Sequence, residues 1–135
     1  MKIREATIRD GESCLRLSQQ EKEHYWSKQN FLRSVKDEDV VLMVAEEEGR
    51  VIGYSLGFVI PTKRIEALLH ETRVDLRFRG EGIGTKLVDA VCEGLFSLGV
   101  DVVYAMIAPK HKLFYIGSCY FKETGKWVEV ARKRG

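Results

Sequence analysis

The hydrophobic and polar positions between residues 40 and 60 predict a β-hairpin. Two mainly apolar runs, Val40–Glu46 and Val51–Ile60, flank the turn at Glu48-Gly49-Arg50. β-Branched residues recur in both runs, and glycine lets the chain reverse direction within a few residues. A further strand is expected over Ile65–Asp75, so this part of the chain predicts three consecutive strands.

After residue 82 the apolar positions follow a helical period. They are spaced by four, one, three and four residues, which places them on one side of a helix: Ile83, Leu87, Val88, Val91 and Leu95. Gly99 is suited to end that helix, since glycine readily adopts the left-handed conformation of a C-terminal cap. An amphipathic helix of about four turns is therefore expected to pack on the strands.

The rest of the chain adds shorter elements. Residues 2–8 predict a strand, and two short helices are expected before residue 39. Residues 100–108 predict a buried strand, Pro109 opens a short helix, and Tyr120–Thr124 with Trp127–Ala131 predict a second hairpin-like pair. The expected order is β-α-α-β-β-β-α-β-α-β-β, which is an α/β protein of the α+β kind, with helices packed on a mixed sheet. At 135 residues we expect one domain spanning 1–135.

Charge excludes one class of partner. The formal net charge is only +2, and acidic and basic residues are mixed along most of the chain. A nucleic-acid-binding protein needs a concentrated basic face, so we expect no nucleic-acid partner. The basic tail Arg132-Lys133-Arg134 is interpreted as a solvated end.

The cysteines and the hydropathy pattern suggest a compartment. Three cysteines without a CxxC pair favour a reducing environment and predict neither a disulfide framework nor a metal site. The N-terminus is charged from Lys2 onward, unlike a signal peptide, and the longest uncharged run, Val51–Thr62, is too short to span a membrane. We therefore expect a cytoplasmic protein, monomeric or homodimeric, without a membrane partner.

Three glycines occupy alternate positions where the strand 65–75 gives way to the helix. The stretch is Arg79-Gly80-Glu81-Gly82-Ile83-Gly84, followed by Thr85. A helix start leaves backbone N–H groups without partners and carries the positive end of the helix dipole. Glycine leaves those amides open to an anion, and the Thr85 hydroxyl adds a donor. The spacing fits neither GxxxxGK[ST] nor GxGxxG, so the motif alone predicts a phosphate-binding turn of another kind.

With its RxxGxG pattern, this stretch resembles the GCN5-related N-acetyltransferases, the GNAT family. Members transfer the acetyl group of acetyl-CoA to an amine, and the motif cradles the pyrophosphate of coenzyme A. Val74 stands five positions before the motif arginine, where the family's strand contacts the pantetheine arm. The resemblance implies acetyl-CoA as co-substrate, no metal, and cofactor contacts from Thr72, Val74, Arg79, Gly80, Glu81, Gly82, Ile83, Gly84 and Thr85.

A second, less regular signature follows the strand 100–108. The family carries a tyrosine that reaches the sulfur of coenzyme A, and Phe114-Tyr115 matches it here. The resemblance implies that Tyr115 is catalytic, because a phenol can protonate the departing thiolate or bind it. Two departures are present: Ala108 replaces the usual asparagine, and the stretch before Phe121 is one residue longer than usual.

The amine must lose a proton, and two candidate bases lie on the strand before the glycine turn. Strict alternation would place Leu68, His70, Thr72 and Val74 on one face, opposite Leu69, Glu71 and Arg73. His70 is one candidate, because an imidazole exchanges its proton near neutral pH and is therefore suited to base catalysis. Glu71 is the other candidate, since a bulge would change which side chain faces the cleft. Either could serve, and both remain open at this point.

The acceptor is not identified by the sequence. In the family the acceptor pocket is variable, and here it is expected around Glu21–Trp26 and Trp127. A primary amine is implied, on a small molecule, a lysine side chain or a protein N-terminus. It would attack the thioester directly in a ternary complex, rather than receive the acetyl group from an acetylated Cys119. The alternative is a non-catalytic acyl-CoA-binding module of the same fold.

Overall fold

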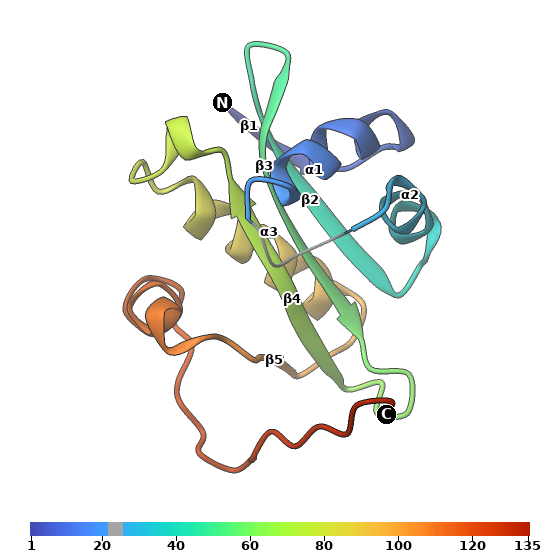
Figure 1. The fold of residues 1–135 in the computed structure, drawn as a ribbon, viewed down its shortest axis with the longest axis vertical. Helices are drawn as coiled ribbons and strands as arrows, with labels where there is room; N and C mark the ends of the chain where they lie inside the picture. Colours follow the sequence, from blue (N-terminus) through green and yellow to red (C-terminus); the bar gives the residue numbers. More distant parts are fainter. Residues whose placement is uncertain (22–25) are drawn as a thin grey trace.

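The computed structural model describes residues 1–21 and 26–135. Five strands form one sheet in the order β1-β2-β3-β4-β5 (Figure 1). The strands are antiparallel except for the last pair, in which β4 and β5 run parallel. Their bounds are β1 Lys2–Glu5, β2 Val40–Glu47, β3 Arg50–Val59, β4 Glu66–Val74 and β5 Val102–Ala105. The expected mixed sheet is therefore confirmed.

The helices cover both faces of the sheet. Helices α1 (Gly11–Ser18) and α2 (Lys28–Lys36) pack on one face, and α3 (Ile83–Ser97) packs on the other (Figure 1). Each face has its own core: Cys14, Leu17 and Phe31 lie on the α1 and α2 side, while Val88, Val91 and Leu95 lie on the α3 side. Short 3₁₀ turns occur at Ile8–Asp10, Leu76–Phe78 and Pro109–His111, and Leu113–Ser118 is a π-helix.

The predicted hairpin of β2 and β3 is confirmed, with Glu48 and Gly49 at its tip, both at positive φ. Gly57 explains how α3 can approach β3. A Cβ atom there would lie 2.9 Å from Leu95 Cδ1 and 3.0 Å from Val91 Cγ1, closer than real Cβ contacts. The absence of a side chain here thus lets α3 pack closely on β3.

A β-bulge in β4 breaks the expected alternation. In the pairing of β3 with β4, Glu71 faces Leu56 while Leu69 faces Gly57, so His70 is an extra residue without a partner. The prediction that His70 shares a face with Val74 is therefore wrong. His70 contacts Trp26 and Glu71 bonds Tyr54, both on the α1 and α2 side, because the bulge shifts the side-chain alternation by one residue.

Strands β4 and β5 separate beyond the bulge. Their pairing covers only Glu66–Leu69 with Val102–Ala105. From His70 to Val74, the β5-side edge of β4 therefore has no strand partner among the described residues. The backbone groups of this edge are available to a ligand that lies along it.

The expected second hairpin near the C-terminus is wrong. In the described part of the chain no strand follows β5, and the last residues run as an extended tail below the sheet (Figure 1). Trp127, Val128 and Val130 are 75–87% exposed. Alternating apolar residues define a strand face, but a strand also needs a hydrogen-bonding partner, and this segment has none among the described residues.

Candidate active site

The glycine turn between β4 and α3 has the features of an anion-binding site. Gly80 and Gly82 have φ values of 84° and 80°, and nothing lies within 4 Å of a Cβ atom added to either. Gly82 caps α3 without a side-chain hydrogen bond. The amides of Ile83, Gly84 and Thr85 donate to no carbonyl group of the described residues. Open space and free first-turn amides thus coincide.

The third glycine has a different role from the one the motif suggested. A Cβ atom on Gly84 would lie 3.1 Å from Phe114 Cζ. Gly84 therefore lets the segment that carries Tyr115 pack against the start of α3, rather than leaving space for an anion. The absence of a side chain at Gly84 thus allows the glycine turn and the segment containing Phe114 and Tyr115 to lie in contact.

Arg79 connects the turn to its surroundings. Its Nε donates to the carbonyl oxygen of Val74 over 3.1 Å, and its Nη2 lies 3.5 Å from Oε1 of Glu21. The carbonyl of Val74, one of the groups expected to bind pantetheine, therefore already accepts one hydrogen bond in this structure and can accept a second. Arg79 remains 44% exposed, so the guanidinium can also turn toward an anion at the turn.

The extra residue before Phe121 is absorbed by unusual backbone geometry. Leu113–Ser118 forms a π-helix, which contains more residues per turn than an α-helix. Tyr120 then takes a positive φ of 64°, and the amide of Phe121 donates to the carbonyl of Tyr115 over 3.1 Å. Tyr115 stays buried, with its ring edge-on to Phe114 and Phe121. The longer spacing therefore does not expel the tyrosine from the core.

Tyr115 lies next to the free edge of β4. Burial raises the pKa of its phenol, and the Thr72 side chain opposes that rise. The hydroxyl of Thr72 is 2.9 Å from the hydroxyl of Ser55 on β3. The phenol thus remains protonated at neutral pH, as a proton donor must. The structure brings Tyr115, Thr72 and Val74 to the same side of the sheet as α3, since Val74 also approaches Gly84.

Glu71 occupies a buried polar cluster on the other side of β4. Its Oε2 accepts a hydrogen bond from the Tyr54 hydroxyl at 2.7 Å, and its Oε1 lies 3.0 Å from Nη2 of Arg73. That ion pair is not aligned as a hydrogen bond, so Glu71 Oε1 and Arg73 Nε remain buried polar atoms without a hydrogen-bond partner. Such atoms are uncommon and mark places where a ligand or water can bind.

His70, the other candidate base, lies at the bulge and is exposed. Its ring packs edge-on against Trp26 with a centroid separation of 5.4 Å, and it tilts over Phe58 at 6.4 Å. Of the residues expected to form the acceptor pocket, Lys22, Glu23, His24 and Tyr25 lie outside the described residues. Trp26 reaches β4 through His70, whereas Trp127 is exposed in the tail and contributes no wall to the site.

Three residues of the site were not predicted from the sequence. Tyr54 and Arg73 hold Glu71, and burial followed by the charge of Glu71 raises the pKa of Tyr54. His111 follows β5, and burial followed by the charges of Lys110 and Arg73 lowers its pKa. The alternation of side chains along a strand could have indicated which face of the sheet Tyr54 lies on. The residues adjacent to Tyr54 in the sequence do not indicate that it contacts Glu71.

The described residues contain neither a cluster of metal-ligating side chains nor a membrane-spanning helix. No group of three or more His, Cys, Asp or Glu side chains among them is arranged to hold a metal ion. No described helix is both long and apolar enough to cross a bilayer. The three cysteines are free, and burial raises the pKa of the Cys119 thiol to about 11. At neutral pH this thiol is therefore a poor nucleophile.

Sequence comparison identifies a family. Residues 5–113 match the model of the acetyltransferase (GNAT) family. Two curated relatives share the name L-2,4-diaminobutyric acid acetyltransferase. The one from Virgibacillus pantothenticus is 30% identical over 69 residues, which is 51% of this chain and 43% of that protein. The one from Nocardia farcinica is 25% identical over 105 residues, which is 78% of this chain and 50% of that protein. The chain thus spans about half the length of these relatives.

Structural comparison supports the same fold. An aminoglycoside N-acetyltransferase crystallised in complex with CoA superposes with a TM-score of 0.79 at 17% sequence identity. The superposition covers 99% of this chain and 100% of that one. At this level of identity the likeness concerns the fold alone.

Proposed function

The chain belongs to the GNAT family of acetyltransferases, and on that premise we propose that it transfers the acetyl group of acetyl-CoA to a primary amine in a ternary complex. One observation carries the proposal: the free edge of β4 from His70 to Val74 leads from the buried cluster of Glu71 to the open glycine turn. Tyr115 lies beside that edge. A thioester, an amine and a proton donor could thus meet along one strand.

The glycine turn fits the diphosphate of coenzyme A. Free amides at Ile83, Gly84 and Thr85 supply donors, Gly80 and Gly82 leave room, and the helix dipole favours negative charge. Thr72 and Val74 would hold the pantetheine arm through backbone groups of the free edge. Arg79 would exchange its contact with Glu21 for the diphosphate, which is the better bidentate partner. When bound, acetyl-CoA supplies the activated acetyl group.

We assign the base role to Glu71 and the acid role to Tyr115. Glu71 would take a proton from the acceptor ammonium, directly or through one water, and the freed nitrogen lone pair would bond to the acetyl carbon. The bond from that carbon to sulfur would break, and the Tyr115 hydroxyl would give its proton to the departing sulfur. The nitrogen would then lose its second proton to the Tyr115 phenolate, directly or through one water, which leaves the amide and the free thiol. Glu71 belongs to the stretch of β4 that has no partner on its β5 side, and Tyr115 lies beside that stretch, which supports a shared site. His70 instead packs on Trp26 and Phe58.

The acceptor is a primary amine, and the names of the curated relatives make L-2,4-diaminobutyrate the first compound to test. A lysine side chain and a peptide N-terminus are the other classes to include. Release of thiol from acetyl-CoA should rise above its hydrolysis background with at least one of these. Absence of acceptor-dependent release on the whole panel, with acetyl-CoA still bound, would overturn the proposal in favour of a non-catalytic acyl-CoA-binding module.

The two candidate bases can be separated by their pH–rate profiles. Glu71→Gln should lower kcat by about 10²–10⁴, the range for loss of general base catalysis, and His70→Gln should leave the acidic limb of the profile in place. Tyr115→Phe should lower kcat by a similar factor with acetyl-CoA binding unchanged. If His70→Gln removes the acidic limb while Glu71→Gln keeps it, the base is His70 and our assignment is wrong.

A further inference from the structure

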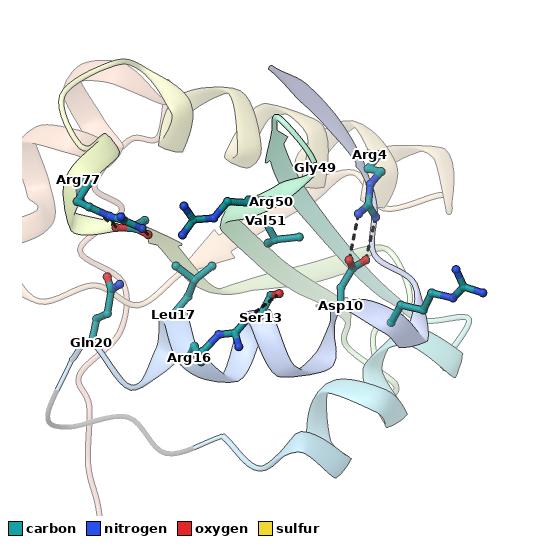
Figure 2. Close-up of a pocket in the computed structure, with 12 residues that line it drawn as sticks. Arg4, Asp10, Ser13, Arg16, Leu17, Gln20, Gly49, Arg50, Val51 and Arg77 are labelled. Atoms are coloured by element: carbon teal, nitrogen blue, oxygen red, sulfur yellow. Dashed lines mark hydrogen bonds and ion pairs between the residues drawn. The ribbon is translucent and has the colours of Figure 1, made fainter.

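A basic groove lies on the α1 side of the molecule, away from α3. It runs between α1, the tip of the β2–β3 hairpin and the segment after β4, and it encloses about 440 Å³ (Figure 2). This volume lies within the range of small-molecule sites. Neither the family match nor the proposed acetyl transfer assigns a role to this groove.

The arginines of the groove outnumber its carboxylates. Five arginines line it, Arg4, Arg9, Arg16, Arg50 and Arg77, against two aspartates, Asp10 and Asp75. Both aspartates are already paired: Asp10 Oδ2 lies 2.8 Å from Arg4 Nη1, and Asp75 Oδ2 lies 3.2 Å from Arg77 Nη2. Among the described residues, Arg9, Arg16 and Arg50 have no carboxylate partner. The groove therefore carries three arginines without an ion pair among the described residues, although Glu12 lies within reach of the charge of Arg16 and Glu47 is the cross-strand partner of Arg50.

Two arginine side chains of the groove converge. Figure 2 shows the guanidinium groups of Arg50 and Arg77 directed toward each other across the groove, whereas Arg16 lies along α1 beside Ser13. Arg16 Nη2 reaches the hydroxyl of Ser13 at 3.3 Å, while the side chain of Arg50 bonds to no described residue. Like charges repel when they face each other, so an anion bound between Arg50 and Arg77 would lower the free energy of both.

We propose that this groove binds a small anionic molecule through phosphate or carboxylate groups, with Arg16 and Arg50 as its main contacts and Arg77 at its edge. Guanidinium groups match both anions in geometry, since each offers two parallel donors to two oxygens. Arg77 can contribute while retaining Asp75, because it remains 62% exposed. The enclosed volume favours a small molecule over a polymer, in agreement with a whole-chain net charge of only +2.

This site is distinct from the glycine turn. The groove lies against α1, whereas the turn begins α3 on the opposite face of the sheet. The two sites are adjacent in the sequence, since Arg77 of the groove precedes Arg79 of the glycine turn by two residues. The proposal does not depend on acetyl transfer, so either could fail without the other.

Nuclear magnetic resonance of the full chain tests the site directly. Citrate and inorganic pyrophosphate, added separately at constant ionic strength, should shift the backbone amides of residues 13–17 and 49–51. Shifts at residues 80–85 with pyrophosphate alone would report the glycine turn separately. A stronger response to pyrophosphate than to citrate would identify phosphate as the preferred group, and the reverse would identify carboxylate.

Substitutions provide the matched control. Arg50→Gln and Arg16→Gln should each weaken binding of the preferred probe by about tenfold, the loss expected for a charge-assisted hydrogen bond. Arg33→Gln removes the same charge from the exposed surface of α2 and should change the affinity less than about twofold. Equal weakening by all three, or a dissociation constant weaker than about 1 mM for both probes in the unsubstituted protein, would overturn the proposal.

Discussion

Replacing Tyr54 by phenylalanine should destabilise the protein through a single lost atom. The ring of Tyr54 is fully buried and packs edge-on to Phe31 at 5.3 Å, and phenylalanine preserves that packing. Only the hydroxyl that donates to Glu71 over 2.7 Å is lost. Its loss leaves a buried carboxylate oxygen without its donor, in a cluster that already contains a second unbonded oxygen.

The magnitude follows from the burial of both partners. A hydrogen bond to a charged group contributes about 1.5–3 kcal/mol, and Glu71 is only 6% exposed, so water cannot replace the donor cheaply. For 135 residues, an unfolding entropy of about 2.1 cal/mol/K per residue totals about 0.28 kcal/mol/K. Tyr54→Phe should therefore lower Tm by about 5–10 °C.

Urea unfolding followed by tryptophan fluorescence measures the loss in free energy of unfolding, and a thermal melt measures the fall in Tm. Tyr104→Phe is the matched control. The Tyr104 hydroxyl on β5 bonds to no described residue, so its removal should change the free energy of unfolding by less than about 0.5 kcal/mol. Combining Tyr54→Phe with Glu71→Gln should cost less than the sum of the single substitutions, because the same contact is removed twice. Equal effects of Tyr54→Phe and Tyr104→Phe, or strict additivity, would refute the role given to this contact.

Three further predictions concern the packing of α3 on β3, the loss of stability at low pH, and the role of Cys119. Gly57→Ala should lower the free energy of unfolding by about 1–3 kcal/mol in the same assay, since the added Cβ meets Leu95 at 2.9 Å; an unchanged value would contradict the packing of α3 on β3. Burial raises the pKa of Asp10, but hydrogen bonds from Arg4 and Thr7 outweigh this effect and hold the pKa below its ordinary value. The ionised Asp10 carboxylate therefore stabilises the folded protein above about pH 4, and this stabilisation is lost as pH falls through the folded-state pKa. Asp10→Asn should therefore flatten the acid limb of a stability–pH curve, and an unaltered limb would exclude this carboxylate as its source. Cys119→Ala should retain acceptor-dependent thiol release, because a thiol with a pKa of about 11 is protonated at neutral pH; abolished turnover with intact folding would favour an acetyl-cysteine route.

Elements with strong local patterns could be predicted from the sequence. The hairpin of β2 and β3, and α3 with Gly99 directly after its C-cap Leu98, follow from apolar periodicity and from turn residues whose conformation is fixed locally. The glycine turn was recognised for the same reason, since free amides at a helix start depend on residues adjacent in sequence. The sequence alone is sufficient to predict an element when the residues that stabilise it are neighbours along the chain.

Features that depend on distant partners could not be predicted. The bulge at His70 arises from the register of β3 against β4, so strict alternation gave the wrong face for this residue. The contact between Tyr54 and Glu71 joins residues 17 positions apart through that same register. The C-terminal pair failed because residues 120–131 have a strand-like pattern, yet pairing requires an edge that the pattern does not specify.

Two glycines at the ends of α3 allow the most direct test of the central claim, that acetyl-CoA is held at the turn before this helix. Gly82 and Gly99 have φ values of 80° and 100°, and neither has an atom within 4 Å of an added Cβ. Alanine at either position should therefore cost about the same backbone strain, roughly 1–2 kcal/mol. Only at Gly82 would the new methyl group enter the space assigned to the diphosphate.

The decisive measurement is acetyl-CoA binding by isothermal titration calorimetry to the unsubstituted protein, Gly82→Ala and Gly99→Ala, all folded at the temperature used. We predict that Gly82→Ala weakens binding by at least about tenfold, or about 1.4 kcal/mol, while Gly99→Ala binds as the unsubstituted protein does. Equal affinity of the two variants, or no binding of acetyl-CoA to the unsubstituted protein, would contradict the account.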